Sequence, residues 1–166
     1  MNNNLLILGA GQYGYVAKEI AEAMGCFGKI SFLDDQSELA IGKLEEYVQF
    51  TMHYRCAIVS IGNADLRLQW IRKLEEACFV VPILVHPQSC VMPSAQLMKG
   101  TIVEPMAVIH SNTTVCVGCI VSAGAVINHN CFLGDCCHVD CNAVVPAREV
   151  LMAGTKVSCG MVYEKK

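Results

Sequence analysis

The sequence predicts a chain in two parts, an α/β domain followed by a parallel β-helix. A glycine-rich turn near the N-terminus stands between a short apolar run and a segment with helical spacing. From residue 91, an apolar residue recurs at every sixth position. The composition is 54% hydrophobic and only 16% charged, against about 25% charged in ordinary domains. This imbalance excludes intrinsic disorder and suggests that a partner subunit covers part of the surface.

Charge and hydropathy exclude several function classes. The net charge of −3 argues against binding to nucleic acid, which needs a basic face. The longest clean apolar run, Cys78–Val85, has eight residues and contains a proline, whereas a membrane-spanning helix needs about 20. We therefore expect no membrane partner. The start at Met1 lacks the basic and apolar segments of a secretion signal, so the expected location is cytoplasmic.

Eleven cysteines are the unusual feature of the composition. A secreted disulfide scaffold is one interpretation, but the count is odd and no export signal is visible. The alternative is a cytosolic chain whose cysteines are small, buried and reduced. The second interpretation is favoured.

The first 24 residues have the pattern of a strand, a turn and a helix. Leu5–Leu8 is apolar, and Gly9, Gly11 and Gly14 follow with the spacing G-x-G-x-x-G. Residues 16–24 then have helical periodicity. Glycines permit a tight turn and a close phosphate, and the N-terminus of the helix offers free N–H groups to an anion. The pattern predicts the opening of a Rossmann-like domain.

An acidic pair follows the second expected strand. Ile30–Leu33 ends at Asp34 and Asp35, and Asp34 stands 20 residues beyond Gly14, where an acidic residue would meet a ribose hydroxyl. A domain whose glycines serve only packing is the alternative. A nicotinamide cofactor fits poorly, because a two-halved dinucleotide fold needs about twice this length. One mononucleotide-type half fits better.

The remaining elements complete the first domain. Cys56–Ile61 predicts a third strand, residues 66–77 a helix with Arg67 off its apolar face, and Phe79–Val85 a last strand. The loops after the first three strands lie where open sheets bind ligands. We expect the domains to be residues 1–85 and 86–166.

The second half repeats every six residues. The recurring apolar positions are Val91, Leu97, Val103, Ile109, Val115, Val121, Ile127, Leu133, Val139, Val145, Leu151, Val157 and Tyr163. Two residues before most of them stands a small residue, often Ala, Thr or Cys. Hexapeptide repeats of this kind make a parallel β-helix in which three repeats form one triangular coil. Thirteen repeats predict a little over four coils.

Two of the repeat cysteines have the spacing of half a zinc site. Cys116 and Cys119 form C-x-x-C, but no second half with clean spacing follows and no histidine completes it. Cys119, Cys131 and Cys137 occupy the small-residue position. Small buried thiols are therefore favoured over a metal site.

Both halves together resemble the NeuD/PglD family of sugar acyltransferases. The resemblance covers essentially the whole chain and depends on Gly9–Gly14, Phe32–Asp35, Ile61–Asn63, His86–Pro87 and Ile127–Val139. The last segment is the most specific, because family members carry two histidines at this nine-residue separation, here His129 and His138.

The resemblance implies an α/β N-terminal Rossmann-like domain followed by a C-terminal left-handed parallel β-helix of hexapeptide repeats. It implies a homotrimer that binds acetyl-CoA as co-substrate between neighbouring subunits, with no metal. His129 would be the general base with Asn130 beside it, and His138 and Ala147 would contact acetyl-CoA. The sugar nucleotide would be bound by Gly9, Gly11, Gln12, Tyr13, Gly14, Asp34, Asp35, Ile61, Gly62 and Asn63.

Two departures from the family pattern leave alternatives open. Relatives usually follow the base with Glu or Asp, but here Asn130 follows it, and the glycines expected after the second histidine are replaced in residues 142–148. The first alternative is an active acetyltransferase that modifies the amine of a UDP-4-amino sugar or a hydroxyl of sialic acid. The second is a trimeric sugar-nucleotide-binding scaffold with weak or no activity. A nicotinamide oxidoreductase would depend on the glycine motif alone.

Overall fold

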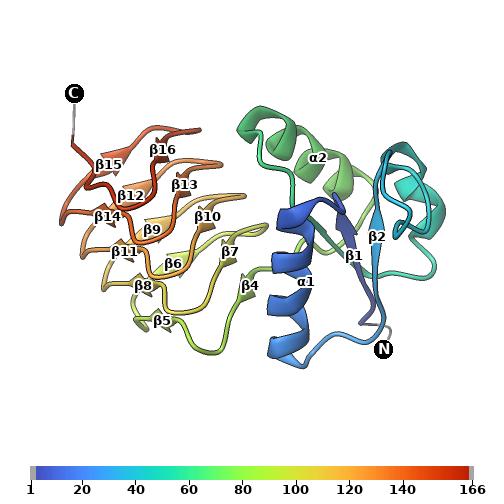
Figure 1. Cartoon of the computed structure of the whole chain (residues 1–166), viewed down its shortest axis with the longest axis horizontal. Helices are drawn as coiled ribbons and strands as arrows, with labels where there is room; N and C mark the ends of the chain where they lie inside the picture. Colours follow the sequence, from blue (N-terminus) through green and yellow to red (C-terminus); the bar gives the residue numbers. More distant parts are fainter. Residues whose placement is uncertain (1–2, 165–166) are drawn as a thin grey trace. The chain divides into compact units, whose positions relative to one another are not determined.

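The computed structural model describes residues 3–164. The chain divides into two compact units, Met1–Pro82 and Ile83–Lys166 (Figure 1). Each unit is described by itself below.

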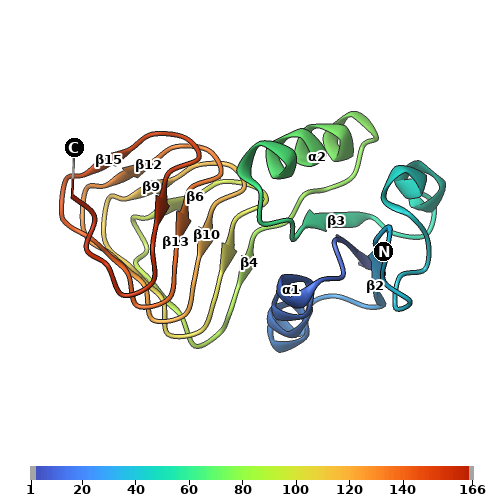
Figure 2. The same ribbon diagram turned by 45° about the horizontal axis from the view of Figure 1, so that its top comes forward.

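The first unit is a small parallel α/β sheet. Its strands are β1 (Leu5–Leu8), β2 (Ile30–Leu33) and β3 (Cys56–Val59), in the order β2-β1-β3. The helices are α1 (Gln12–Met24), α2 (Ala64–Glu76) and the short 3-10 helix η1 (Leu44–Phe50). Figure 2 shows α1 and α2 on opposite faces of this sheet, as right-handed crossovers on either side of a central strand require.

Backbone conformation and close packing require glycine at two positions between β1 and the first turn of α1. Gly9 has a φ of +107°, which side chains rarely adopt, and a Cβ at Gly14 would overlap the carbonyl oxygen of Gly9. The Ser60 hydroxyl lies 2.8 Å from the carbonyl oxygen of Gly9 and 3.0 Å from that of Leu8, and can donate to either. The turn is thereby held to the end of β3.

Two sequence expectations for this unit were wrong in detail. The expected strand Phe79–Val85 is divided: Val80 makes a single bridge to β3, whereas β4 (Leu84–Val85) pairs with the β-helix. Pro82 lies between them, and proline cannot donate to a ladder. Arg67 is not off the apolar face of α2 but is 1% exposed and lies among its buried residues.

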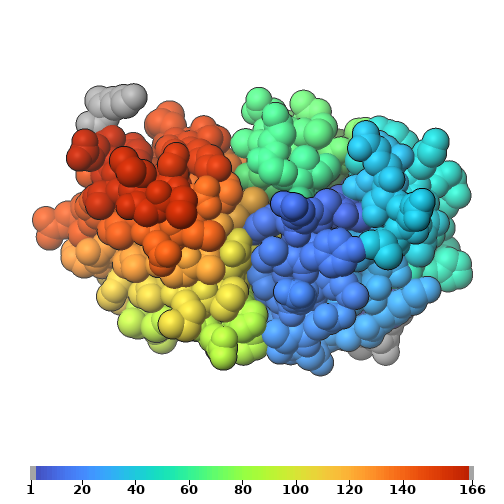
Figure 3. All heavy atoms as spheres, viewed as in Figure 1, coloured from blue at the N-terminus to red at the C-terminus, as the bar shows by residue number. Residues whose placement is uncertain are grey.

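The second unit is the expected left-handed parallel β-helix, with three faces. Face 1 contains β4, β7 (Ile102–Val103), β10 (Ile120–Val121), β13 (His138–Val139) and β16 (Lys156–Val157). Face 2 contains β5 (Cys90–Val91), β8 (Val108–Ile109), β11 (Val126–Ile127) and β14 (Val144–Val145). Face 3 contains β6 (Gln96–Leu97), β9 (Thr114–Val115), β12 (Phe132–Leu133) and β15 (Val150–Leu151). The coils are visible as successive colour bands in Figure 3.

The predicted apolar column forms the core of the β-helix. Its members from Val103 to Leu151 are fully buried, and Val157 is 4% exposed. Val91, Leu97 and Tyr163 pack against this core at its ends. Val85, six residues before Val91, joins it as well, so the six-residue period starts one repeat earlier than the sequence suggested.

Small inward residues connect neighbouring coils through hydrogen bonds. The side chain of the small residue donates to a carbonyl oxygen fifteen residues further along, as in Cys119 Sγ to Gly134 O at 3.2 Å. The other donors of this kind are Thr101, Thr113, Cys131 and Cys137. Cysteine and threonine thus serve the same structural purpose, and all eleven cysteines are free thiols.

Each corner of the coil repeats one residue with left-handed backbone conformation. The three series are Gly100, Gly118, Cys136 and Gly154; Met106, Gly124, Asn142 and Gly160; and Asn112, Asn130 and Arg148. Glycine and asparagine tolerate this conformation best, which bears on Asn130 below.

No helix in residues 3–164 is long and apolar enough to cross a membrane.

Candidate functional site

His129 lies in the turn between β11 on face 2 and β12 on face 3. Its side chain is half-buried. Its backbone N–H donates to Asn128 Oδ1 at 2.7 Å, and its carbonyl oxygen accepts from the Arg148 N–H of the next coil at 3.0 Å. These contacts fix the backbone from which the imidazole projects.

Asn130 holds the His129 ring from the side. It has a φ of +59°, and its N–H donates to the carbonyl oxygen of Ser111 at 3.0 Å. Its side-chain amide lies against the ring, with Nδ2 at 2.7 Å from His129 Nδ1. A half-turn of the amide exchanges Nδ2 for Oδ1 at the same place. With Oδ1 there, Nδ1 carries the proton and Nε2 is free to act as a base.

Ala147 lies one coil beyond His129. Because Ile127 pairs with Val145 in register, Ala147 occupies the equivalent turn position eighteen residues later. Its neighbour Arg148 has a φ of +68° and donates its N–H to His129. The predicted base and this predicted acetyl-CoA contact are therefore adjacent in the stack.

His138 lies on β13 in face 1, beside a small polar cluster. Its Nε2 is 3.1 Å from Ser122 Oγ and 3.9 Å from Asp140 Oδ1. Asp140 Oδ2 pairs with Lys156 Nζ at 3.0 Å. Burial would raise the pKa of Asp140, but the Cys141 N–H and the Lys156 ammonium hold it below its ordinary value. The carboxylate is thus ionised near His138.

The two histidines do not meet within one chain. His129 lies in the corner between faces 2 and 3, whereas His138 lies on face 1, half a coil further along. In a triangular coil that corner is opposite face 1. A site that uses both side chains must therefore draw them from two copies of the chain.

The glycine turn of the α/β unit is closed by Asp34. Asp34 Oδ2 accepts from the Ala10 N–H at 2.7 Å, and Oδ1 accepts from the N–H groups of Gln36 and Ser37, each at 2.9 Å. The hydrogen bond from Ala10 is the largest cause of a lowered Asp34 pKa; burial opposes it, and the other two N–H groups add to it. The acidic residue expected at a ribose also organises the turn.

The other predicted sugar-nucleotide residues gather at the carboxyl ends of the three strands. Gly11 caps α1, Gln12 begins it and is exposed, and Tyr13 follows half-buried. Asp35 Oδ1 accepts from the Leu44 N–H at 3.1 Å, so it holds the start of η1. The structure therefore brings the loops after β1 and β2 together at one edge of the sheet.

The loop after β3 is held by a residue that the sequence analysis left out of the site. Arg67 Nη1 donates to the carbonyl oxygens of Ile61 at 2.7 Å and Gly62 at 2.9 Å. Asn63 Oδ1 caps α2 by accepting from the Leu66 N–H at 2.9 Å. The signal for Arg67 was its helical spacing, since it stands three residues before Trp70 and seven before Leu74, both buried.

Within residues 3–164, no cluster of three or more His, Cys, Asp or Glu side chains could hold a metal ion. Burial raises the pKa of the Cys116 thiol, and a hydrogen bond with Cys137 is the largest cause of a raised pKa at Cys119. Both thiols are thus kept protonated in the folded protein.

Comparison with known proteins identifies the two-part architecture. The PglD N-terminal domain family matches residues 4–74. The acetyltransferase domain of PglB from Neisseria gonorrhoeae, in complex with acetyl coenzyme A, is 23% identical, with a TM-score of 0.74, covering 96% of this chain and 90% of that one. No curated protein sequence matches the chain.

Two further solved structures share the fold. PerB from Caulobacter crescentus, in complex with CoA and GDP-perosamine, is 21% identical, with a TM-score of 0.75 and coverage of 98% and 89%. WeeI from Acinetobacter baumannii is 12% identical, with a TM-score of 0.60 and coverage of 96% and 93%.

The class defined by these features joins a Rossmann-like domain to a left-handed β-helix. The match at residues 4–74 and the shared fold confirm the resemblance to the NeuD/PglD family.

Proposed function

We propose that this protein transfers an acetyl group from acetyl-CoA to the amine of a nucleotide-activated amino sugar, with His129 as the general base. The carrying observation is the half-buried His129 ring, held through Nδ1 by Asn130 in a turn of a β-helix. The fold is shared with PglB, solved with acetyl coenzyme A, and PerB, solved with CoA and GDP-perosamine. Those complexes support the choice of both substrates.

The reaction needs a base, because the thioester is already activated. The amine nitrogen attacks the acetyl carbonyl carbon, and His129 Nε2 takes the proton that the nitrogen loses. The C–S bond then breaks and the sulfur leaves as the thiol of CoA, after the proton passes to it from the imidazolium. The products are the N-acetylated sugar and free CoA.

We assign the two substrates to the two parts of the chain. Residues 1–85 would bind the sugar nucleotide at the loops after β1, β2 and β3, and residues 86–166 would bind acetyl-CoA near Ala147 and His138. A hydroxyl acceptor such as sialic acid needs the same base, so it is the second substrate to test. GDP-perosamine in PerB adds GDP to UDP as a candidate nucleotide carrier of the acceptor sugar.

Assembly and location complete the proposal. A homotrimer would bring His129 of one copy toward His138 of another, which one chain alone does not do. The eleven free thiols are consistent with the reducing cytoplasm.

His129→Ala tests the catalytic assignment. We expect the rate of CoA release from acetyl-CoA with a nucleotide amino sugar to fall about 100- to 10,000-fold, the usual contribution of a general base. Acetyl-CoA binding by calorimetry and the mass in solution should stay unchanged. His53→Ala, an exposed histidine of the α/β unit, is the matched control and should keep full activity.

One alternative is favoured by a specific observation. Asn130 stands where relatives carry an acidic residue, which fits a sugar-nucleotide-binding scaffold that has lost catalysis. If the wild-type protein turns over no thioester with UDP- or GDP-linked amino sugars or sialic acid, and binds no acetyl-CoA, the scaffold is the correct function. Binding of NAD(H) in a fluorescence titration would instead indicate an oxidoreductase.

A further inference from the structure

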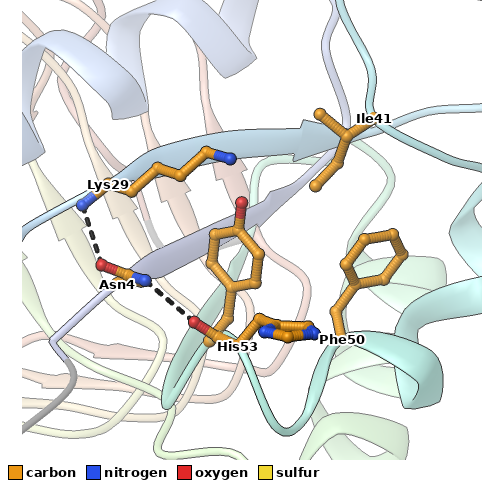
Figure 4. Close-up of a pocket in the computed structure, with 6 residues that line it drawn as sticks. Asn4, Lys29, Ile41, Phe50 and His53 are labelled. Carbon is orange, nitrogen blue, oxygen red and sulfur yellow. Dashed lines mark hydrogen bonds between the residues drawn. The ribbon is translucent and has the colours of Figure 1, made fainter.

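A pocket lies at the amino ends of the strands in the α/β unit. It has a volume of about 420 Å³ and is lined by Asn4, Lys29, Ile41, Phe50, His53 and Tyr54 (Figure 4). Asn4 and Lys29 directly precede β1 and β2, and Tyr54 stands two residues before β3. The glycine turn and Asp34 lie at the opposite, carboxyl edge of the same sheet. The pocket is therefore separate from the proposed sugar-nucleotide site.

Hydrogen bonds fix the floor of this pocket. Asn4 Oδ1 accepts from the Lys29 N–H at 2.9 Å, and Asn4 Nδ2 donates to the carbonyl oxygen of His53 at 2.9 Å. Tyr54 is 3% exposed, and its hydroxyl lies 2.7 Å from Ser31 Oγ in a buried hydrogen bond. Since the floor is tied by these bonds in the free protein, its shape does not depend on a ligand.

The walls are apolar on one side. Figure 4 shows Ile41 and Phe50 across the pocket from Asn4. The Phe50 ring packs edge-on against Tyr54 with centroids 6.1 Å apart. Gly42 lets Phe50 approach, because a Cβ there would lie 3.3 Å from its Cζ. Ile41 remains 45% exposed, so this wall offers an unburied apolar surface to a ligand.

The ionisable residues that line the pocket are all basic. Lys29 and His53 are basic, and none of the six lining residues is acidic. Within residues 3–164 the Lys29 ammonium makes no ion pair or hydrogen bond, although its backbone N–H does. A single lysine ammonium can neutralise one negative charge, and the apolar wall of Ile41 and Phe50 suits a ligand whose charge is confined to one end. A carboxylate with an apolar body meets both conditions.

We propose that this pocket binds a small carboxylate with a flat apolar body. The carboxylate would pair with the Lys29 ammonium, and the body would lie against Ile41 and Phe50. The volume falls in the range of pockets that take small molecules, and apolar walls with a few placed polar groups are their usual chemistry.

Benzoate is the probe, titrated into the full-length ¹⁵N-labelled protein while backbone amide shifts are recorded. We expect saturable shifts at Lys29, Ile41 and His53 at millimolar benzoate. Benzyl alcohol, which has the same ring without the charge, should bind at least about fivefold more weakly. Lys29→Gln should weaken benzoate binding by a similar factor. Lys18→Gln, on α1 and outside the pocket lining, is the matched control and should bind as the wild type does.

Each outcome decides the proposal independently of acetyl transfer. Absence of saturable shifts at these amides overturns it, as does equal benzoate affinity in Lys29→Gln and Lys18→Gln. Equal binding of benzyl alcohol would remove the role of charge and overturn the carboxylate assignment. Lys29 is exposed, so its substitution leaves the buried floor intact.

Discussion

Asn130 adopts the left-handed backbone conformation of its corner, and its side chain also contacts the His129 ring. The coil requires a left-handed residue there, as at Asn112 and Arg148 in the same series. Asparagine tolerates that conformation better than most residues. The same side chain lies 2.7 Å from His129 Nδ1. An amide can orient the imidazole, but it carries no charge to stabilise the cation formed when Nε2 takes a proton.

Asn130→Asp tests this limit. Aspartate also tolerates the left-handed conformation, and its carboxylate can only accept, so it holds the proton on Nδ1 and leaves Nε2 as the base. We expect the kcat for acetyl transfer to rise about tenfold or more. The measurement is CoA release under saturating substrates, with Asn112→Asp as the control for backbone effects. A kcat at or below the wild-type value would show that the amide already performs the full task.

Asp34 makes the stability of the α/β unit depend on pH. Three N–H groups hold its carboxylate, and its pKa is below the ordinary value in the folded state. The stabilisation is therefore complete above the unfolded pKa of about 4 and is lost as the pH falls through the lowered folded pKa.

Asp34→Asn should lower the free energy of unfolding of this unit by about 1–3 kcal/mol at pH 7, because hydrogen bonds to a charged acceptor are lost. The difference from wild type should shrink as the pH falls below the ordinary carboxyl pKa of about 4. The single tryptophan, Trp70, lies in this unit and reports its unfolding in urea by fluorescence. Glu38→Gln, an exposed neighbour, is the control. A difference that persists unchanged at low pH would contradict the role of ionisation.

The strands of the β-helix were the easiest elements to predict. Each inward residue must be apolar whatever its neighbours are, so the six-residue period is visible in the amino-acid sequence. The C-terminal boundary of the α/β unit was harder to predict. An apolar run such as Phe79–Val85 does not show which sheet its backbone will join, and Pro82 divided it between two.

The sequence indicates which residues are candidates for the site, but it does not show where they lie or which groups they contact. The nine-residue spacing identified His129 and His138, yet only the coil geometry shows that they lie on different sides of the β-helix. Arg67 was placed off the apolar face because a charge is normally exposed. Its guanidinium is buried because it donates to the carbonyl oxygens of Ile61 and Gly62. These oxygens belong to the loop before α2, so the periodicity of the helix does not reveal them.

The inter-coil thiol bonds can be tested by matched substitutions. Cys119→Val keeps the volume but leaves the carbonyl oxygen of Gly134 without this donor, whereas Cys119→Thr retains one, as Thr101 does in the coil before. We expect the valine variant to be about 1–3 kcal/mol less stable than the threonine variant. Thermal unfolding by circular dichroism compares the two. Equal stability would mean that the thiols serve only to fill space.

In the whole molecule, His129 and His138 lie on opposite sides of the triangular coil. Within a chain, the corner that carries His129 faces away from the strand that carries His138. A closed ring of identical copies would place the corner of one copy beside a face of the next. The arrangement therefore predicts that acetyl transfer needs His129 and His138 from two different chains, which an activity assay can test without a structure of the assembly.

Co-expression of His129→Ala with His138→Ala, under two different tags, tests whether each active site draws on two chains. Either variant alone should be inactive or strongly impaired. In a trimer that contains both variants, about one site in three would combine an intact His129 with an intact His138 from its neighbour. Mixed trimers purified through both tags should thus regain about a third of the wild-type rate of CoA release. If the mixed assemblies stay as impaired as the single variants, both histidines act within one chain or in separate steps, and the two-chain site is wrong.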